Sequence, residues 1–171
     1  MFKLHHRINR ILIKLSYRFG VSKLFSMPKM LALDPTNLCD LKCPLCPTGL
    51  RDKTVQRGSI KLEQFKIIVN RLGKHLQSIN LYSWGEPLLH KSLVDMIRHT
   101  AINHKIRTIT SVHLGNLSDE QVEGLATSGL DKLIVSVDGT TQEVYEKYRV
   151  GGDIEKVFAN MKRLVEAKKR H

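Results

Sequence analysis

The 171-residue chain has only three cysteines, and all of them lie within residues 39–46. An odd, clustered set excludes the disulfide framework of a small secreted protein and predicts a reducing compartment, the cytoplasm. The sequence also lacks an uncharged apolar run of about 18 residues, which excludes a membrane span. Its N-terminus is interrupted by charge too often for a secretory signal. Aromatic residues are few and no recognition module is visible, so no specific nucleic-acid binding is expected.

Acidic residues are absent before Asp34, although the net charge is +12 and this stretch holds seven bases: Lys3, Arg7, Arg10, Lys14, Arg18, Lys23 and Lys29. Apolar residues recur there at helical spacing, namely Leu4, Ile8, Ile11, Leu12, Leu15 and Phe19. The pattern predicts that residues 1–29 form a basic amphipathic N-terminal helix. We favour the interpretation in which its apolar stripe packs on the rest of the domain. A peripheral contact with a membrane surface, or with an acidic partner, is the alternative.

The three cysteines form the motif CxxxCxxC, with Cys39, Cys43 and Cys46 on one short loop. Close-spaced thiolates of this kind bind iron–sulfur clusters, usually together with a fourth cysteine. Three thiolates would hold a four-iron, four-sulfur (4Fe–4S) cube by three corners and leave the fourth iron without a protein ligand. A Cys3His zinc site, closed by His90 or His113, is the alternative.

After the basic helix, strand and helix patterns alternate along residues 30–171, which we expect to form one domain. The predicted strands are Met30–Asp34, Ile79–Ser83, Ile106–Val112 and Leu133–Val137. The predicted helices cover Leu62–Leu72 with Gly73 at the C-terminal cap, Ser92–Asn103, a segment from the Ser118 cap to near Gly129, a short helix capped by Thr140, and a final helix from Asp153. In the final helix Ile154, Val157, Phe158, Met161, Leu164 and Val165 are expected to face inward. The order predicts an α/β fold of four β/α units around a parallel sheet, and the apolar fourth strand predicts cover on both faces.

Polar or reactive residues follow every predicted strand. Thr36, Asn37 and the cysteines follow the first, Gly85 and Glu86 the second, His113 and Asn116 the third, and Ser136 and Asp138 lie at the end of the fourth. Because the carboxyl ends of parallel strands meet at one edge, we expect these residues to share a single site.

The CxxxCxxC motif, followed by Gly85-Glu86-Pro87 and Ser136-Val-Asp138-Gly139, resembles the radical S-adenosylmethionine (radical SAM) enzymes. The stretches LYSWGEPLLH (81–90) and SVDGTTQEVYEKYRVGGD (136–153) further resemble the SPASM-type branch, whose members often carry auxiliary clusters in a C-terminal extension and act on peptides or proteins. The resemblance runs from about Leu31 to the end of the chain. It implies a partial (β/α) barrel with about four of the usual six units, and hence a truncated or split product. We expect an open edge on the fourth strand and, as one partner, a chain that supplies the missing strands.

The resemblance also implies the site chemistry. Cys39, Cys43 and Cys46 would ligate the 4Fe–4S cluster, and S-adenosylmethionine would bind its fourth iron and yield a 5′-deoxyadenosyl radical that takes hydrogen from an unknown substrate, such as a peptide. Cofactor-binding roles are implied for Gly85, Glu86, Ser136 and Arg149: Glu86 would accept from the ammonium group, Ser136 would meet the ribose or carboxylate, and Arg149 the carboxylate. No catalytic residue beyond the cluster ligands is assigned. A flavodoxin- or ferredoxin-type donor would supply the electron.

Alternatives stay open at several positions. Instead of binding the cofactor, Gly85 would only form a tight turn, and Ser136 would be a strand serine that bonds to the backbone. Arg149 would be an exposed arginine at a helix end, and we favour this alternative for that residue. Trp84 would either cover the cluster or fill the core. The family's third strand usually ends in a Thr-Asn-Gly turn, but here it ends in Val112-His113-Leu114-Gly115-Asn116. His113 would therefore lie over the site or, as we slightly favour, be a buried histidine with satisfied hydrogen bonds. For the whole chain, the alternatives are a non-catalytic iron–sulfur or zinc module, or an inactive fragment that acts through its basic helix.

Overall fold

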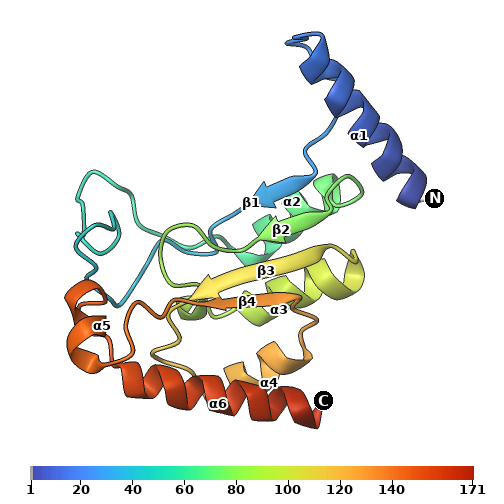
Figure 1. Cartoon of the computed structure of the whole chain (residues 1–171). Coiled ribbons are helices and arrows are strands. Elements are labelled where there is room, and N and C mark those ends of the chain that lie inside the picture. The colour runs from blue at the N-terminus through green and yellow to red at the C-terminus, as the bar shows by residue number, and fades with distance from the viewer. Residues whose placement is uncertain (1) are drawn as a thin grey trace.

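The computed structural model describes residues 2–171, with side chains described from His6 onward, so Lys3 and Leu4 of the predicted amphipathic pattern lie outside the described side chains. Four strands form one parallel sheet in the order β1-β2-β3-β4: β1 (Met30–Ala32), β2 (Ser78–Asn80), β3 (Arg107–Val112) and β4 (Lys132–Val135). Sequential order without a reversal is the topology of a barrel arc rather than of a doubly wound sheet. The predicted partial (β/α) barrel of four units is therefore confirmed (Figure 1).

The helices that connect the strands form one layer against the sheet. They are α2 (Leu62–Leu72), α3 (Leu93–Arg98), α4 (Asp119–Thr127), α5 (Gln142–Tyr148) and α6 (Ile154–Arg170), with a single 3-10 turn, η1 (Pro87–Leu89), after β2. Neighbours in this layer touch in the order α2, α3, α4, α6, and α5 packs on α6 near the carboxyl ends of the strands (Figure 1). The core lies between the helices and the sheet, where Phe65, Ile79 and Met96 are fully buried.

The strands are buried mainly on the face that the helices cover. On β3 the buried residues alternate, with Thr108, Thr110 and Val112 on the buried face. On β4, Leu133, Ile134 and Val135 are only partly buried. The expectation that the fourth strand is covered on both faces is therefore wrong. The physical reason is that β4 is an edge strand, which pairs within the described residues with β3 alone, on a sheet whose helices cover one side.

Strand starts agree with the predictions to one residue, but β1, β2 and β4 end two or three residues earlier than expected. Single backbone hydrogen bonds continue past these ends, such as Leu81 N–H to Ile109 O at 2.8 Å and Ser136 N–H to Val112 O at 2.9 Å. Beyond them the chain turns away from the sheet into the loops of the site. The regular hydrogen-bond pairing between the strands stops where the loops of the site begin, although apolar residues continue in the sequence.

The predicted helices are present, with corrections at their ends. Residue 73 caps α2, Ser118 caps α4 with a reciprocal capping box, and Asp153 caps α6, as predicted. Thr141 rather than Thr140 caps α5, because its hydroxyl accepts from the Val144 N–H. The predicted helix over 92–103 stops at Arg98 and continues as a π-helix, η2 (His99–Asn103).

Two further corrections concern packing. The Thr100 hydroxyl donates toward the carbonyl groups of Met96 and Ile97, which disturbs the regular helical ladder where the π-helix begins. On α6, Phe158 and Val165 are exposed rather than inward-facing, because the buried stripe runs through Ile154, Val157, Asn160 and Ala167.

The basic N-terminal segment forms the predicted amphipathic helix, α1 (Phe2–Arg18), but the helix ends well before residue 29, because the chain turns at Gly20, whose φ is +61°. α1 stands apart from the sheet and its helices (Figure 1). Among the described residues it makes no extensive contact with another helix or strand. Ile8, Ile11 and Leu15 of the apolar stripe are exposed. The favoured interpretation, in which this stripe packs on the domain, is therefore wrong. No helix within residues 2–171 is long and apolar enough to cross a membrane.

Candidate active site

A cavity of about 170 Å³ lies at the carboxyl ends of the strands. Its wall includes the cysteine loop, the turn after β2, the ends of β3 and β4, and the end of α5. All seven residues with a predicted metal or cofactor role line this cavity: Cys39, Cys43, Cys46, Gly85, Glu86, Ser136 and Arg149. The fold thus brings together residues from the loops after β1, β2 and β4, as their positions after the strands predicted, and adds Arg149 from the end of α5. Four other residues expected to share the site do not line the cavity: Thr36, Asn37, Asn116 and Asp138.

The cysteine loop is held in place by backbone contacts at both of its ends. Before it, the Thr36 hydroxyl donates to the Gly58 carbonyl at 3.0 Å and accepts from the Leu38 N–H at 3.1 Å. After it, Gly49 packs directly on Cys43, and a Cβ atom at residue 49 would lie 2.5 Å from the Cys43 backbone nitrogen. The loop therefore folds back on itself, which turns its three side chains into the same cavity.

The three thiols are free, and Cys43 is buried while Cys39 and Cys46 are partly buried. Burial raises the pKa of the Cys43 thiol, and the positive charge of Arg149 opposes that increase. Three uncrosslinked thiols on one small cavity wall fit a metal or cluster, whose positive charge would favour their deprotonated form. The donor set thus suits a three-thiolate iron–sulfur cluster.

Glu86 is 3% exposed and lies on the cavity wall. Its two carboxyl oxygens accept from the backbone N–H groups of Leu88 at 3.2 Å and His113 at 2.8 Å. Burial raises the pKa of this carboxyl above its ordinary value. A cationic group placed in the cavity would offset that cost, so the position suits a carboxylate that binds an ammonium group.

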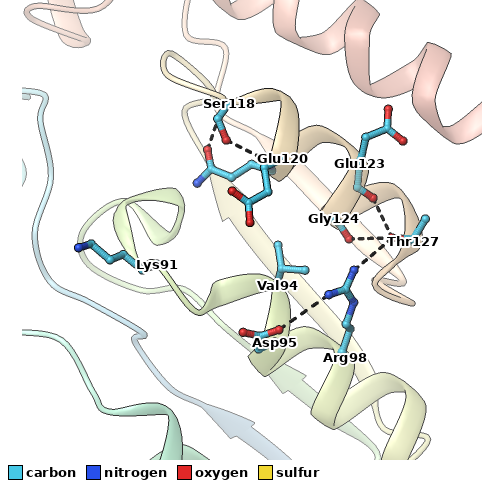
Figure 2. Close-up of a pocket in the computed structure, with 10 residues that line it drawn as sticks. Lys91, Val94, Asp95, Arg98, Ser118, Glu120, Glu123, Gly124 and Thr127 are labelled. Carbon is cyan, nitrogen blue, oxygen red and sulfur yellow. Dashed lines mark hydrogen bonds and ion pairs between the residues drawn. The ribbon is translucent and has the colours of Figure 1, made fainter.

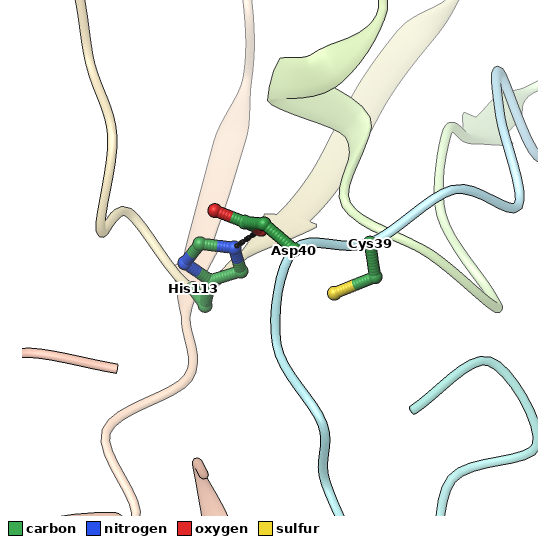
Figure 3. A group of neighbouring side chains, drawn as sticks. All are labelled: Cys39, Asp40 and His113. Carbon is green, nitrogen blue, oxygen red and sulfur yellow. Dashed lines mark hydrogen bonds and ion pairs between the residues drawn. The ribbon is translucent and has the colours of Figure 1, made fainter. Parts of the chain in front are cut away.

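His113 connects the end of β3 to the cysteine loop. Its Nε2 atom lies 2.7 Å from Asp40 Oδ1 (Figure 3). The same atom lies 3.4 Å from Glu86 Oε2. The Gly115 N–H donates to Nδ1 at 2.9 Å, so Nε2 carries a hydrogen and donates it to Asp40. The two alternatives predicted for His113 are both correct: the residue is a buried, hydrogen-bonded histidine, and it also lines the cavity.

The network around His113 shifts the pKa of both partners. Burial lowers the pKa of His113, but the hydrogen bond to Asp40, the contact with Cys39 and the charge of Glu86 together raise it above its ordinary value, while the Gly115 N–H bond to Nδ1, which only the neutral ring accepts, opposes that increase. The same hydrogen bond from His113 holds the pKa of Asp40 below its usual value. Asp40 is thus an ionised carboxylate beside the first cysteine of the motif.

Arg149 is placed by the end of α5, where it is the C-cap residue, and by the Asp138 carboxylate, which accepts from its Nε. Its Nη1 lies 3.9 Å from Cys43 Sγ, and its guanidinium lies over the Tyr148 ring. The favoured interpretation of an exposed helix-end arginine is therefore wrong, because the side chain is only 20% exposed and faces the cavity. Asp138, which was expected at the shared site, orients this arginine.

Gly85 has a φ of +86° and contacts the segment that precedes the cysteines. A Cβ atom there would lie 2.5 Å from Thr36 O and 2.8 Å from Leu38 O. The glycine thus permits a close crossing of two loops as well as a place on the cavity wall. Its neighbour Trp84 is 50% exposed and is absent from the cavity wall, so neither alternative offered for it is supported.

The zinc alternative receives unequal support from its two histidines. His90 lies outside the cavity, and its ring nitrogens contact Ile60 O at 2.8 Å and Ser92 N–H at 3.1 Å. His113, by contrast, forms a group with Cys39 and Asp40 whose potential ligand atoms lie within 4.8 Å of one another (Figure 3). A thiolate, a carboxylate and an imidazole are also ligands that zinc accepts. This group includes only one of the three cysteines, so it is not the predicted Cys3His set, and metal analysis distinguishes zinc from an iron–sulfur cluster.

Several cavity residues were not expected from the sequence. Leu41, Tyr82, Ser83 and Ser111 line the wall, and Asp40 supports it. The position of Asp40 between cysteines was an available signal, whereas Ser111 is one polar residue in a strand and carries no signal of its own. Asn116, which follows β3, donates to Asp40 Oδ2 at 2.8 Å instead of lining the cavity.

A second hollow of about 710 Å³ lies between α3 and α4 (Figure 2). Within its polar wall, Arg98 lies beside Asp95 and donates to Thr127, and Ser118 takes part in the capping box of α4. It shares no lining residue with the cysteine-lined cavity. This hollow is the groove between two packed helices, where Gly124 lies against Val94.

The fold and the site together define an α/β barrel-type protein with a three-cysteine centre at the carboxyl ends of its strands. Residues 33–171 match the radical SAM superfamily, and the chain belongs to this family. Proteins of this family use a 4Fe–4S cluster and S-adenosylmethionine for radical chemistry, and the curated relatives are enzymes. Membership of this family does not favour the non-catalytic zinc-module alternative.

Curated relatives match the chain over most of its length. PqqA peptide cyclase from Rhodopseudomonas palustris is 32% identical over 136 residues, which cover 78% of this chain and 34% of that protein. A probable GTP 3′,8-cyclase from Methanococcus maripaludis is 31% identical over 134 residues, which cover 78% of this chain and 44% of the relative. The chain thus spans between a third and a half of the length of these two relatives.

Solved structures share the fold. SuiB from Streptococcus suis, in a crystal structure with S-adenosylmethionine, aligns with a TM-score of 0.72 at 19% identity, over 92% of this chain and 35% of SuiB. Methylornithine synthase aligns with a TM-score of 0.63 at 16% identity, over 95% of this chain and 48% of that protein. At these identities the similarity establishes the fold alone.

Proposed function

We propose that this chain holds a 4Fe–4S cluster through Cys39, Cys43 and Cys46 and binds S-adenosylmethionine beside it. The observation that carries the proposal is that three free thiols and the buried Glu86 carboxylate line one cavity. When bound and reduced by one electron, the cluster and its ligand supply a 5′-deoxyadenosyl radical that abstracts hydrogen from a substrate. Three free thiols also suit a reducing compartment such as the cytoplasm.

The residues of this chain would bind and orient the ligand. Glu86 would accept hydrogen bonds from the ammonium group, because its carboxylate is buried and already fixed by two backbone N–H groups. Arg149 would pair with the ligand carboxylate from the opposite loop, held in place by Asp138. The Ser136 hydroxyl, at the end of β4, would meet a hydroxyl or carboxylate oxygen. Gly85 would keep the intervening wall free of side-chain atoms.

We further propose that the substrate is a peptide. The support is that one relative is named a PqqA peptide cyclase and that SuiB has been crystallised with its precursor peptide SuiA. A low-potential donor with an acidic face, of the flavodoxin or ferredoxin type, would suit the basic surface of the chain. Further strands, from this polypeptide or a complementing chain, would pair with the free edge of β4 and complete the barrel.

The test is anaerobic reconstitution of the chain with iron and sulfide, followed by dithionite and S-adenosylmethionine. The expected result is release of 5′-deoxyadenosine, measured by chromatography. Glu86→Gln should retain the cluster but weaken S-adenosylmethionine binding about 10- to 100-fold, the effect of losing one charge-assisted hydrogen bond. Glu63→Gln, at an exposed carboxylate in the first turn of α2, is the matched control and should bind as the wild type does. A cluster that forms without any cleavage would contradict the enzymatic proposal for this chain.

A further inference from the structure

The Asn9 side chain fixes one face of α1 against the segment that follows the helix. Asn9 Nδ2 donates to Met27 O at 2.8 Å, and the Met27 N–H donates to Asn9 Oδ1 at 2.8 Å. Asn9 is buried, although the residues on either side of it are exposed. The helix is therefore held in a defined rotation, with its Asn9 face toward residues 20–30.

That rotation directs large apolar side chains to solvent. Ile8, Ile11 and Leu15 lie along one face of α1, and Phe19 follows at the same spacing just past its end. Ile11 and Phe19 are 56% and 72% exposed. Phe25, in the following segment, is 82% exposed and extends the apolar surface beyond the helix. Exposed apolar residues grouped in this way mark an interaction surface rather than ordinary surface composition.

A row of bases adjoins the apolar face. Arg7, Arg10, Lys14 and Arg18 follow the same helical spacing one position earlier, and all four are exposed. They have no acidic neighbour in the sequence, since the first acid is Asp34. Residues 1–29 hold seven of the 28 bases of the chain and none of its 16 acids. The other 21 bases and all 16 acids lie in residues 30–171. The charge of this segment is thus uncompensated.

We propose that α1 and the segment after it dock on an anionic lipid surface. A helix with an exposed apolar face, a row of Lys and Arg beside it and low overall hydrophobicity lies in the interface of a bilayer, where its apolar face enters the acyl boundary and its bases meet the headgroups. Anionic lipid supplies both partners that this surface lacks, an apolar medium and negative charge. The proposal is independent of the cluster, because α1 stands apart from the sheet (Figure 1).

Charge also decides against a second copy of the chain as the occupant. Two copies of α1 would bring two uncompensated rows of bases together, and like charges at close range repel. An acidic protein groove would bind the apolar stripe and the bases of α1. It would leave the apolar residues that follow the helix, such as Leu24 and Phe25, exposed to water. A lipid surface accommodates both without a matching shape.

The test is co-sedimentation of the full chain with vesicles of phosphatidylcholine alone or with added phosphatidylglycerol. We expect binding to the anionic vesicles, weakened by salt, and little binding to the neutral ones. The double variant Arg10→Gln with Lys14→Gln should weaken binding about 30-fold, since each base near an anionic surface contributes about fivefold. Ile11→Asp should weaken vesicle binding at least about tenfold, because the aliphatic side chain that would insert into the bilayer is lost.

Matched controls lie on α6, where Lys168→Gln with Lys169→Gln removes two exposed bases and Val165→Asp replaces an exposed aliphatic residue. These variants should bind the vesicles as the wild type does. Equal binding to neutral and anionic vesicles, or α1 variants that bind like the wild type, would overturn the proposal. A dimer in sedimentation equilibrium that Ile11→Asp dissociates, without vesicle binding by the wild type, would overturn it in favour of a second copy.

Discussion

His113 Nε2 lies 2.7 Å from Asp40 Oδ1, and this hydrogen bond joins the end of β3 to the loop that carries the cysteines. The same histidine presents its backbone N–H to Glu86 Oε2. One residue therefore positions both the cysteine loop and the carboxylate proposed to bind the ligand. Where the family usually has a Thr-Asn-Gly turn, this chain has a bridge between two parts of its site.

We predict that His113→Ala loosens the site without removing its ligands. The change removes a buried donor to an ionised carboxylate, and such losses cost about 1.5–3 kcal/mol of unfolding free energy. Denaturant unfolding of the cluster-free chain measures this effect. In the reconstituted protein, the electron paramagnetic resonance spectrum of the reduced cluster should change while the iron content stays the same.

Asn116→Ala is the matched control for that variant. Asn116 is the other side-chain partner of Asp40, but it is exposed and contacts only the outer carboxylate oxygen. Its removal should cost about 0.5 kcal/mol, the low end for a hydrogen bond open to water. Equal effects of the two variants would contradict the positioning role of His113.

Gly85→Ala should destabilise the chain far more than Gly151→Ala. The two glycines have nearly the same φ, +86° and +85°, so both substitutions incur the strain of a left-handed backbone, about 1–2 kcal/mol. Only at Gly85 would the new Cβ atom meet backbone, at 2.5 Å from Thr36 O, whereas at Gly151 nothing lies within 4 Å. We expect Gly85→Ala to cost at least about 3 kcal/mol in unfolding free energy. Similar losses for both variants would show that the loop crossing is not tight.

His99 should make the fold less stable in mild acid. Burial, with His104 and Lys66 nearby, lowers the pKa of His99 from its ordinary 6.5. As the pH falls below about 6.5, the unfolded chain therefore takes up a proton at this residue before the folded chain does, and stability falls. Unfolding free energies measured at about pH 7.5 and 5.5 should differ less in His99→Gln than in the wild type. An identical pH dependence would contradict this assignment.

The order of strands and helices could be predicted from the sequence because each apolar run lies between recognisable caps and turns. Ser118 and Asp153 cap their helices as predicted, and the glycine at position 73 ends α2. The carboxyl ends of the strands could not be predicted to the residue. Apolar side chains there continue into the loops, and only the hydrogen-bond ladder defines where a strand stops.

Within the site, the motif residues were predicted because they follow successive strands and because their motifs resemble those of the radical SAM family. Arg149 was misjudged, since its inward direction depends on the bend at the end of α5 and on Asp138, eleven residues earlier. The apolar stripe of α1 was also misjudged. Periodicity reveals that a helix has an apolar face, but not which surface that face meets.

The most direct test of the account is iron and acid-labile sulfide analysis, with electron paramagnetic resonance, of the anaerobically reconstituted chain and its single Cys→Ser variants at positions 39, 43 and 46. We predict about four irons and four sulfides per chain in the wild type, a spectrum that changes when S-adenosylmethionine is added, and loss of the cluster in each variant. Full iron content in any of the three variants, or one tightly held zinc without sulfide in the wild type, would contradict the central claim that three thiols hold a cluster with one open iron.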